Sequence, residues 1–223
     1  MTSALGALTV LLIGLMVGPT WGQTAPSIGE LLQMLHSGGY VIVVRHGATN
    51  PDQADTDPFN PDNISKQREL SDKGRADAKL LGDVFKAAGV PIGKSYSSQF
   101  YRALETARLI GGKSPTATPD VTEGGLVVSP NENNRRAQAF RAIVATSPDP
   151  GTNTLVVTHK PNILDAFGKD WFEIQEGEAS IFKPDGRGDY SLIARVPIGP
   201  VGGRHKVTRR PAAGTSPTDA GAG

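Results

Sequence analysis

The chain has 223 residues, of which 20% are charged and 38% hydrophobic, and its formal net charge at pH 7 is +1. A chain of this length can bury the core of one ordinary domain, and its balanced charge points to neither a nucleic-acid nor an anionic-membrane partner. It contains no cysteine, which excludes disulfides and thiol catalysis and fits an exported protein.

The opening segment, MTSALGALTVLLIGLMVGPTWGQTAPS, carries no charged side chain. Its apolar stretch, from about Ala4 to Val17, is short for a membrane span and typical of a secretory signal. We therefore predict a signal peptide over residues 1–22, with Ala25 as a second cleavage position, and a periplasmic or secreted protein. The segment departs from the usual signal pattern because a basic n-region is missing. On grounds of length, an uncleaved signal that anchors the chain to the membrane stays an alternative.

The stretch YVIVVRHGATN puts an apolar run directly before Arg45 and His46. A helix capped by Ser27 is expected before it, over residues 28–37. The run is rich in Val and Ile and lacks polar alternation, which predicts a strand buried on both faces in the middle of a parallel sheet. Ligands bind at the carboxyl ends of strands in such sheets, so an Arg–His pair at this point is placed for chemistry.

Residues 51–63 are dense in Pro, Asp and Asn, which predicts a surface loop that can cover this site. Ser71 then caps a helix that runs to about Ala88. A short strand, VPIGKSYSSQ, leads to a helix over residues 101–110 with Arg102 in its first turn.

Residues 113–133 are expected to be irregular and to pass over the site a second time, and residues 134–146 to be helical. A buried strand, Leu155 to Thr158, leads to His159, and a helix from Pro161 to about Phe167 follows. The segments EASIFK and YSLIARV, joined by PDGRGD, predict an antiparallel hairpin at the sheet edge.

This alternation predicts a three-layer α/β/α sandwich with a mostly parallel central sheet over residues 26–200. Residues 201–223, rich in Gly, Pro and Ala, are predicted to be a disordered tail. In such a sheet His46 and His159 are expected at the same edge, and Arg45 and Arg102 are expected beside them. Two imidazoles and two guanidiniums form a pocket for an anion, and guanidinium forks match phosphate oxygens.

Four motifs, VVRHGAT, LSDKGRADA, SSQFYRALETA and VVTHKPNI, occur in this order between Val43 and Ile163. In order and spacing they resemble the histidine phosphatase superfamily, which has the phosphoglycerate-mutase-like fold, in its shorter branch (branch 1). Within it, the layout is most similar to the exported lipopolysaccharide core heptose phosphatase-like group. The resemblance covers the chain from Tyr40 to about Val196.

The resemblance implies that His46 is a nucleophile that forms a phosphohistidine, which water then hydrolyses. A backbone carbonyl is expected to hold its other ring nitrogen. Arg45, Arg102 and a protonated His159 would hold the phosphoryl oxygens. Gly47 would let the backbone approach the phosphate, and Thr49 would add a hydroxyl donor.

The superfamily also uses a carboxylic acid to protonate the leaving oxygen. Glu123 is the first candidate, because the acid of the family falls in the interval after the Arg102 helix, and Glu132 and Asp57 are its rivals. Lys160, where the superfamily often has Gly, is a candidate for steering an anionic substrate.

Three further charged residues are candidates for supporting roles. Glu105 is expected to pair with Arg102 at helical spacing. Arg135 and Arg136 are either a second anion site or a plain helix face, and the helix face is favoured.

The leading hypothesis is a metal-independent phosphomonoesterase that needs no cofactor and acts on a phosphorylated small molecule or envelope sugar. No close-spaced pair of metal ligands is present that would support a metallohydrolase. A protein phosphohistidine phosphatase and a non-catalytic phosphate-binding module are the alternatives. The pattern specifies neither the natural substrate nor the oligomeric state.

Overall fold

The computed structural model describes residues 26–124 and 128–197. The predicted signal peptide over residues 1–22 and the predicted tail over residues 201–223 lie outside the described residues. None of the described helices is long and apolar enough to span a membrane.

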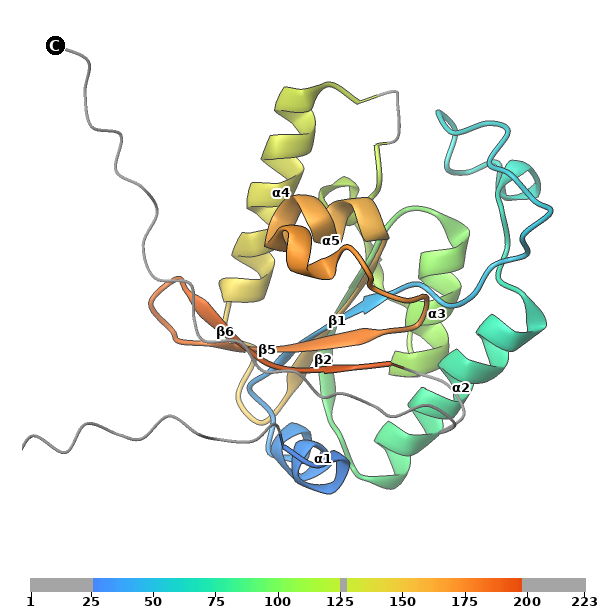
Figure 1. Ribbon diagram of the computed structural model, residues 1–223. Coiled ribbons are helices and arrows are strands. Elements are labelled where there is room, and N and C mark those ends of the chain that lie inside the picture. The colour runs from blue at the N-terminus through green and yellow to red at the C-terminus, as the bar shows by residue number, and fades with distance from the viewer. Residues whose placement is uncertain (1–25, 125–127, 198–223) are drawn as a thin grey trace, which may run out of the picture.

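A six-stranded sheet forms the centre of the molecule (Figure 1). Its strands are arranged in the order β3 (Thr116–Ala117), β2 (Ile92–Ser97), β4 (Asn153–Thr158), β1 (Val41–Arg45), β5 (Ala179–Pro184) and β6 (Tyr190–Val196). The first four strands are parallel to one another, and β5 and β6 add an antiparallel hairpin at the edge. The predicted mostly parallel sheet and its terminal hairpin are therefore confirmed.

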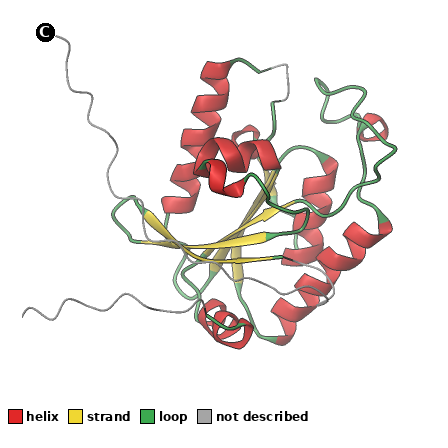
Figure 2. Cartoon of the chain, in the orientation of Figure 1, coloured by secondary structure: helices red, strands yellow, loops and turns green. Residues whose placement is uncertain are grey.

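Helices cover both faces of the sheet (Figure 2). Alternate residues of β1 pack on opposite sides: Ile42 and Val44 face one core, and Val41 and Val43 face the other. The first core is closed by α1 (Ile28–His36), α2 (Asp72–Ala87) and α3 (Tyr101–Gly111), and the second by α4 (Pro130–Ala145) and α5 (Lys160–Phe167). This is the predicted three-layer sandwich.

Single turns of 3-10 helix lie in the connections. They are η1 (Ile64–Lys66), η2 (Pro119–Val121) and η4 (Lys169–Trp171).

The segment after β2 is more regular than predicted. Residues 113–133 contain β3, η2 and the first turn of α4, which begins at Pro130 rather than at residue 134. The Ser129 hydroxyl accepts a hydrogen bond from the Glu132 amide, and Pro130 occupies the first turn, where a proline costs no hydrogen bond. The predicted start of this helix was therefore wrong.

The loop behind His46 is locked against the first turn of α2. The Ser71 amide and hydroxyl both donate to Ala48 O, at 2.9 and 3.1 Å. A Cβ on Gly74 would overlap with the same carbonyl oxygen, so only a glycine lets the two segments approach this closely. The LSDKG motif thus supports the backbone on which the nucleophile candidate sits.

Candidate active site

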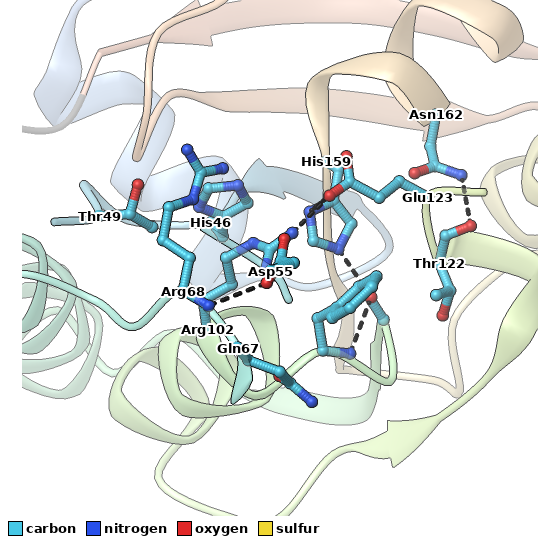
Figure 3. Close-up of polar contacts among 12 residues, drawn as sticks. His46, Thr49, Asp55, Gln67, Arg68, Arg102, Thr122, Glu123, His159 and Asn162 are labelled. Atoms are coloured by element: carbon cyan, nitrogen blue, oxygen red, sulfur yellow. Dashed lines mark hydrogen bonds and ion pairs between the residues drawn. The ribbon is translucent and has the colours of Figure 1, made fainter. Parts of the chain in front are cut away.

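The carboxyl ends of β1 and β4 bring two histidines together, as predicted. The two strands pair in register from Val41–Thr154 to Arg45–Thr158, and the His46 amide donates to Thr158 O at 2.9 Å. His46 and His159 follow directly, with ring centroids 5.0 Å apart, and both side chains are buried (Figure 3).

His46 is held as a neutral imidazole with one free ring nitrogen. Its Nδ1 lies 2.9 Å from Gly47 O, and because a carbonyl can only accept, Nδ1 carries the proton. Burial, followed by the charge of Arg102, lowers the pKa of His46 to about 3. Nε2 therefore offers an unprotonated lone pair at neutral pH, and the backbone carbonyl expected from the sequence is Gly47 O.

His159 is oriented by a buried hydroxyl. Its Nε2 lies 2.7 Å from Ser98 Oγ, which itself accepts the Phe100 amide at 3.2 Å. His159 Nε2 is the one acceptor that the described residues offer to the Ser98 hydroxyl proton, so the proton of the imidazole is on Nδ1. That Nδ1 is buried without a hydrogen-bond partner, 3.5 Å from Glu123 Oε1. The site thus contains a donor with no acceptor among the described groups.

The expected protonated His159 is not what the structure supports. Burial lowers the pKa of His159 well below its usual range, and the charge of Arg102 adds to this effect. His159 is therefore a neutral donor through Nδ1–H in the protein alone.

Arg102 lies between two carboxylates. Its guanidinium is fully buried, and Nη1 donates to Asp55 Oδ1 at 2.9 Å while Nη2 contacts Glu123 Oε1 (Figure 3). The predicted Arg102–Glu105 pair is wrong: Glu105 Oε1 instead binds Arg75 Nε of α2 at 2.9 Å. Contact between α2 and α3 thus overrides the local helical spacing.

Arg45 and Thr49 share a carboxylate that the sequence did not reveal. Arg45 Nη1 donates to Ile174 O at 2.8 Å, and its Nη2 lies 3.4 Å from Glu176 Oε1. The Thr49 hydroxyl donates to the same oxygen at 3.3 Å. Arg45 Nε stays buried without a hydrogen-bond partner.

Of the three candidate acids, the structure brings Glu123 to His159 and Arg102. The preceding residue is fixed by three contacts: Asn162 Nδ2 and Arg136 Nη1 donate to Thr122 O, at 3.1 and 2.9 Å, and the Gln99 amide donates to Thr122 Oγ1 at 2.9 Å. Glu123 therefore extends from an anchored backbone toward Arg102 and His159.

The two rival carboxylates are engaged elsewhere. Glu132 accepts hydrogen bonds from Arg135 and Arg136, which lower its pKa to about 2 and make it a poor proton donor. Asp57 Oδ2 accepts from Asn63 Nδ2 at 2.8 Å within its own loop.

The remaining predicted basic residues have protein partners. Arg135 also binds Asp120 Oδ1 at 2.8 Å, so Arg135 and Arg136 belong to a network of ion pairs on the helix surface. Lys160 Nζ lies 4.6 Å from the centroid of the Phe172 ring.

Two residues that sequence reasoning missed come from the loop between β1 and α2. Asp55 binds Arg102, and Arg68 donates its backbone amide to Asp55 Oδ1 at 2.9 Å. Gln67 ties the same loop to the start of α3, because its Oε1 accepts the Tyr101 amide at 2.7 Å. The sequence predicted a loop able to cover the site, but no periodicity marks which of its side chains turn inward.

Within the described part of the chain, no three His, Cys, Asp or Glu side chains are arranged to hold a metal ion.

Comparison with known proteins agrees with this geometry. The family model of the histidine phosphatase superfamily (branch 1) matches residues 41–126, which include His46, Arg102 and Glu123. No curated protein sequence matches the chain significantly.

Solved structures are similar to this chain at low sequence identity. The protein histidine phosphatase SixA complexed with tungstate has a TM-score of 0.50 and 19% identity, over 70% of this chain and 95% of SixA. YhfR of Bacillus stearothermophilus has a TM-score of 0.49 and 21% identity, over 69% of this chain and 94% of its own. A mycobacterial glucosyl-3-phosphoglycerate phosphatase has a TM-score of 0.49 and 16% identity, over 69% of this chain and 96% of the phosphatase.

The similarity to SixA shows a common fold, and the sequence match covers the strand, loop and helix that carry His46 and Arg102. Residues 41–126 of the chain are thus similar to the histidine phosphatase superfamily, branch 1.

Proposed function

We propose that the protein is a metal-independent phosphomonoesterase that acts through a phosphohistidine on His46. One observation carries the proposal: His46 Nε2 is an unprotonated lone pair, set by the Nδ1–Gly47 O contact, beside Arg102 and a second buried histidine. A nucleophile that is neutral at pH 7 and surrounded by cationic donors suits attack on an anionic phosphoryl group.

The proposed first step transfers the phosphoryl group to the enzyme. His46 Nε2 forms a bond to phosphorus while the bond from phosphorus to the ester oxygen breaks. Arg102, Arg45 Nε and the His159 Nδ1–H are the donors for the phosphoryl oxygens, and they stabilise the charge in the transition state. The leaving oxygen takes a proton from Glu123, whose carboxylate lies against Arg102 and His159.

In the second step, Glu123 removes a proton from water, and the water oxygen forms a bond to phosphorus. The bond between phosphorus and His46 Nε2 breaks, which releases inorganic phosphate and restores the neutral imidazole. Phosphate would compete with Asp55 and Glu123 for the Arg102 guanidinium, because all three are anions.

The proposed substrate is a small phosphate ester, such as an envelope sugar phosphate of the heptose phosphatase type. The resemblance of the sequence to that group supports this choice, and so does the signal-like apolar segment at residues 4–17. A periplasmic or secreted location follows from the same segment.

Hydrolysis of an aryl phosphate by the chain without residues 1–22, in the presence of a chelator, tests the proposal. We expect turnover that vanadate inhibits, loss of turnover in His46→Ala, and an acid-labile phosphoryl group on His46 in rapidly quenched samples. The control is His36→Ala, because His36 Nδ1 contacts the carbonyl oxygens of Ala88 and Gly89, away from the site.

Other outcomes would favour the alternatives. Binding of phosphate without turnover of any ester would favour a non-catalytic phosphate-binding module. Turnover of phosphohistidine peptides in preference to sugar phosphates would favour a protein phosphohistidine phosphatase. Turnover that the chelator abolishes would contradict the proposed mechanism.

A further inference from the structure

Arg68 brings a third guanidinium to the site, and this guanidinium has no protein partner. Its Nε is buried without a hydrogen-bond partner, and none of its side-chain nitrogens forms an ion pair or hydrogen bond within residues 26–124 and 128–197. Arg45 and Arg102, by contrast, both contact carboxylates. Arg68 is therefore the unpaired cation of the three.

The position of Arg68 is tied to that of Arg102. Asp55 Oδ1 accepts the Arg68 amide and the Arg102 Nη1–H, both at 2.9 Å, so one carboxylate oxygen spans the two residues. The neighbouring Gln67 is fixed on the first turn of α3. From this anchored backbone the Arg68 side chain runs toward His46 (Figure 3).

The charge of Arg68 acts on three of the predicted phosphate-binding groups. It lowers the pKa of His46, of His159 and of Arg45, in addition to the effect of burial on each of them. A partly desolvated guanidinium that faces neutral imidazoles and another guanidinium is unfavourable unless an anion completes the arrangement. The group that would satisfy it is an anion placed beside His46 Nε2.

We propose that Arg68 is a further phosphoryl-binding residue, which donates to an oxygen of the phosphate group that His46 attacks. Asp55 is its positioning residue, because it holds the Arg68 backbone against Arg102. This inference rests on the proposed function and extends it: the site would hold a phosphate dianion with three guanidiniums rather than two.

Calorimetric titration of the chain without residues 1–22 with orthovanadate and with inorganic phosphate tests this proposal without requiring turnover. We compare wild type with Arg68→Gln and Arg68→Lys, and use Arg187→Gln as the control for loss of one positive charge. Arg187 is 88% exposed and pairs with Asp185 in the β5–β6 turn. Thermal melting of each variant checks that it is folded.

We expect Arg68→Gln to weaken the binding of both anions by about 10- to 100-fold, the range for one hydrogen bond to a charged group. Arg68→Lys should weaken binding less, because lysine keeps the positive charge and loses only the bidentate hydrogen bonding of the guanidinium. Arg187→Gln should bind as wild type does. If Arg68→Gln fails to fold, Arg68→Lys decides the question through its deficit relative to Arg187→Gln.

Equal anion affinity in wild type and both Arg68 variants would overturn the role of Arg68 and leave the proposed function intact. A wild type that binds neither anion and hydrolyses no phosphate ester would overturn both. A wild type that binds vanadate and turns over substrate, with affinity lost only in the Arg68 variants, supports both.

Discussion

Ser98 is predicted to set the tautomer of His159. Replacement by alanine removes the hydroxyl that lies 2.7 Å from His159 Nε2 and 3.2 Å from the Phe100 amide. The imidazole then loses the donor that keeps its proton on Nδ1, the nitrogen left without a hydrogen-bond partner in the site. Under the proposed function, Ser98 is a positioning residue, because it would act on the phosphate through His159.

The size of the effect follows from the two contacts. A buried polar group left unsatisfied costs about 1–3 kcal/mol, so removing a hydroxyl that serves two such groups should lower the free energy of unfolding by about 2–6 kcal/mol. A hydrogen bond to a charged phosphoryl group contributes about 1.5–3 kcal/mol, so its loss should lower kcat/KM by about 10- to 100-fold.

Nitrogen NMR of histidine-labelled protein separates the tautomer from a general loss of stability. In wild type we expect the proton on Nδ1 of both His46 and His159, and in Ser98→Ala we expect His159 to move toward the Nε2–H form while His46 stays unchanged. Ser97→Ala is the matched control, because the Ser97 hydroxyl is also buried but donates to Ser98 O rather than to an imidazole.

Two results would refute this reasoning. One is a wild-type His159 protonated on Nε2, and the other is a Ser98→Ala variant whose His159 tautomer and kcat/KM match those of Ser97→Ala.

Three further predictions concern the acid, the nucleophile and the packing behind it. Glu123→Gln should lower kcat for an alkyl phosphate by about 10²- to 10⁴-fold but affect an aryl phosphate with a good leaving group far less, whereas Glu132→Gln should match wild type; equal losses on both esters would exclude Glu123 as the leaving-group acid. The folded-state pKa of His46, about 3, lies below its unfolded value near 6.5, so its stabilising contribution is complete above pH 6.5 and is lost as the pH falls toward 3. In urea unfolding, the stability of wild type relative to His46→Asn should therefore fall by about 2 kcal/mol between pH 7.5 and pH 5, and a constant difference would contradict the lowered pKa. Gly74→Ala should cost about 1–3 kcal/mol in thermal or urea unfolding because its Cβ meets the loop behind His46, whereas Gly29→Ala in α1, with open space around it, should gain about 0.5–1 kcal/mol.

The fold was predictable because its signals are local and repeated. The central strands β1 and β4 are apolar runs that end on a polar residue. The main helices follow strands along the chain, as the apolar patterns predict. The first turn of α4 was missed although Ser129, Pro130 and Glu132 form a helix-start pattern. Its polar composition, with Asn at three of the first five positions, concealed that signal.

The two histidines were predictable for a geometric reason. Parallel strands end at one edge of a sheet, so residues that directly follow β1 and β4 meet there whatever the loops do. Arg102 is similarly determined, because it lies in the first turn of a helix that follows a third parallel strand, β2. These positions depend on the scaffold alone.

Asp55 and Arg68 do not have this property. They lie 13 residues apart in an irregular loop, and they meet because one carboxylate oxygen accepts both the Arg68 amide and the Arg102 guanidinium. No spacing rule encodes that contact, and a Pro-, Asp- and Asn-rich loop offers many equivalent carboxylates, of which Asp57 is one. The prediction of a Glu105–Arg102 pair was wrong for the same reason. Glu105 forms its ion pair with Arg75 of a neighbouring helix, a tertiary contact that spacing along one helix does not reveal.

The division between scaffold and loop has a consequence for chemistry. Under the proposed function, the scaffold supplies the nucleophile, the second imidazole and two guanidiniums, which are the groups proposed to bind and attack the phosphoryl group. The loops supply what surrounds them: Asp55 and Arg68 from the segment before α2, Glu123 after η2, and Glu176 beside Arg45. Because three of these four are carboxylates that compete with phosphate for guanidinium groups, substrate binding must displace or protonate some of them. The loops therefore decide how tightly an anion binds and where the leaving-group proton comes from, and the same loops would decide which phosphate ester is accepted.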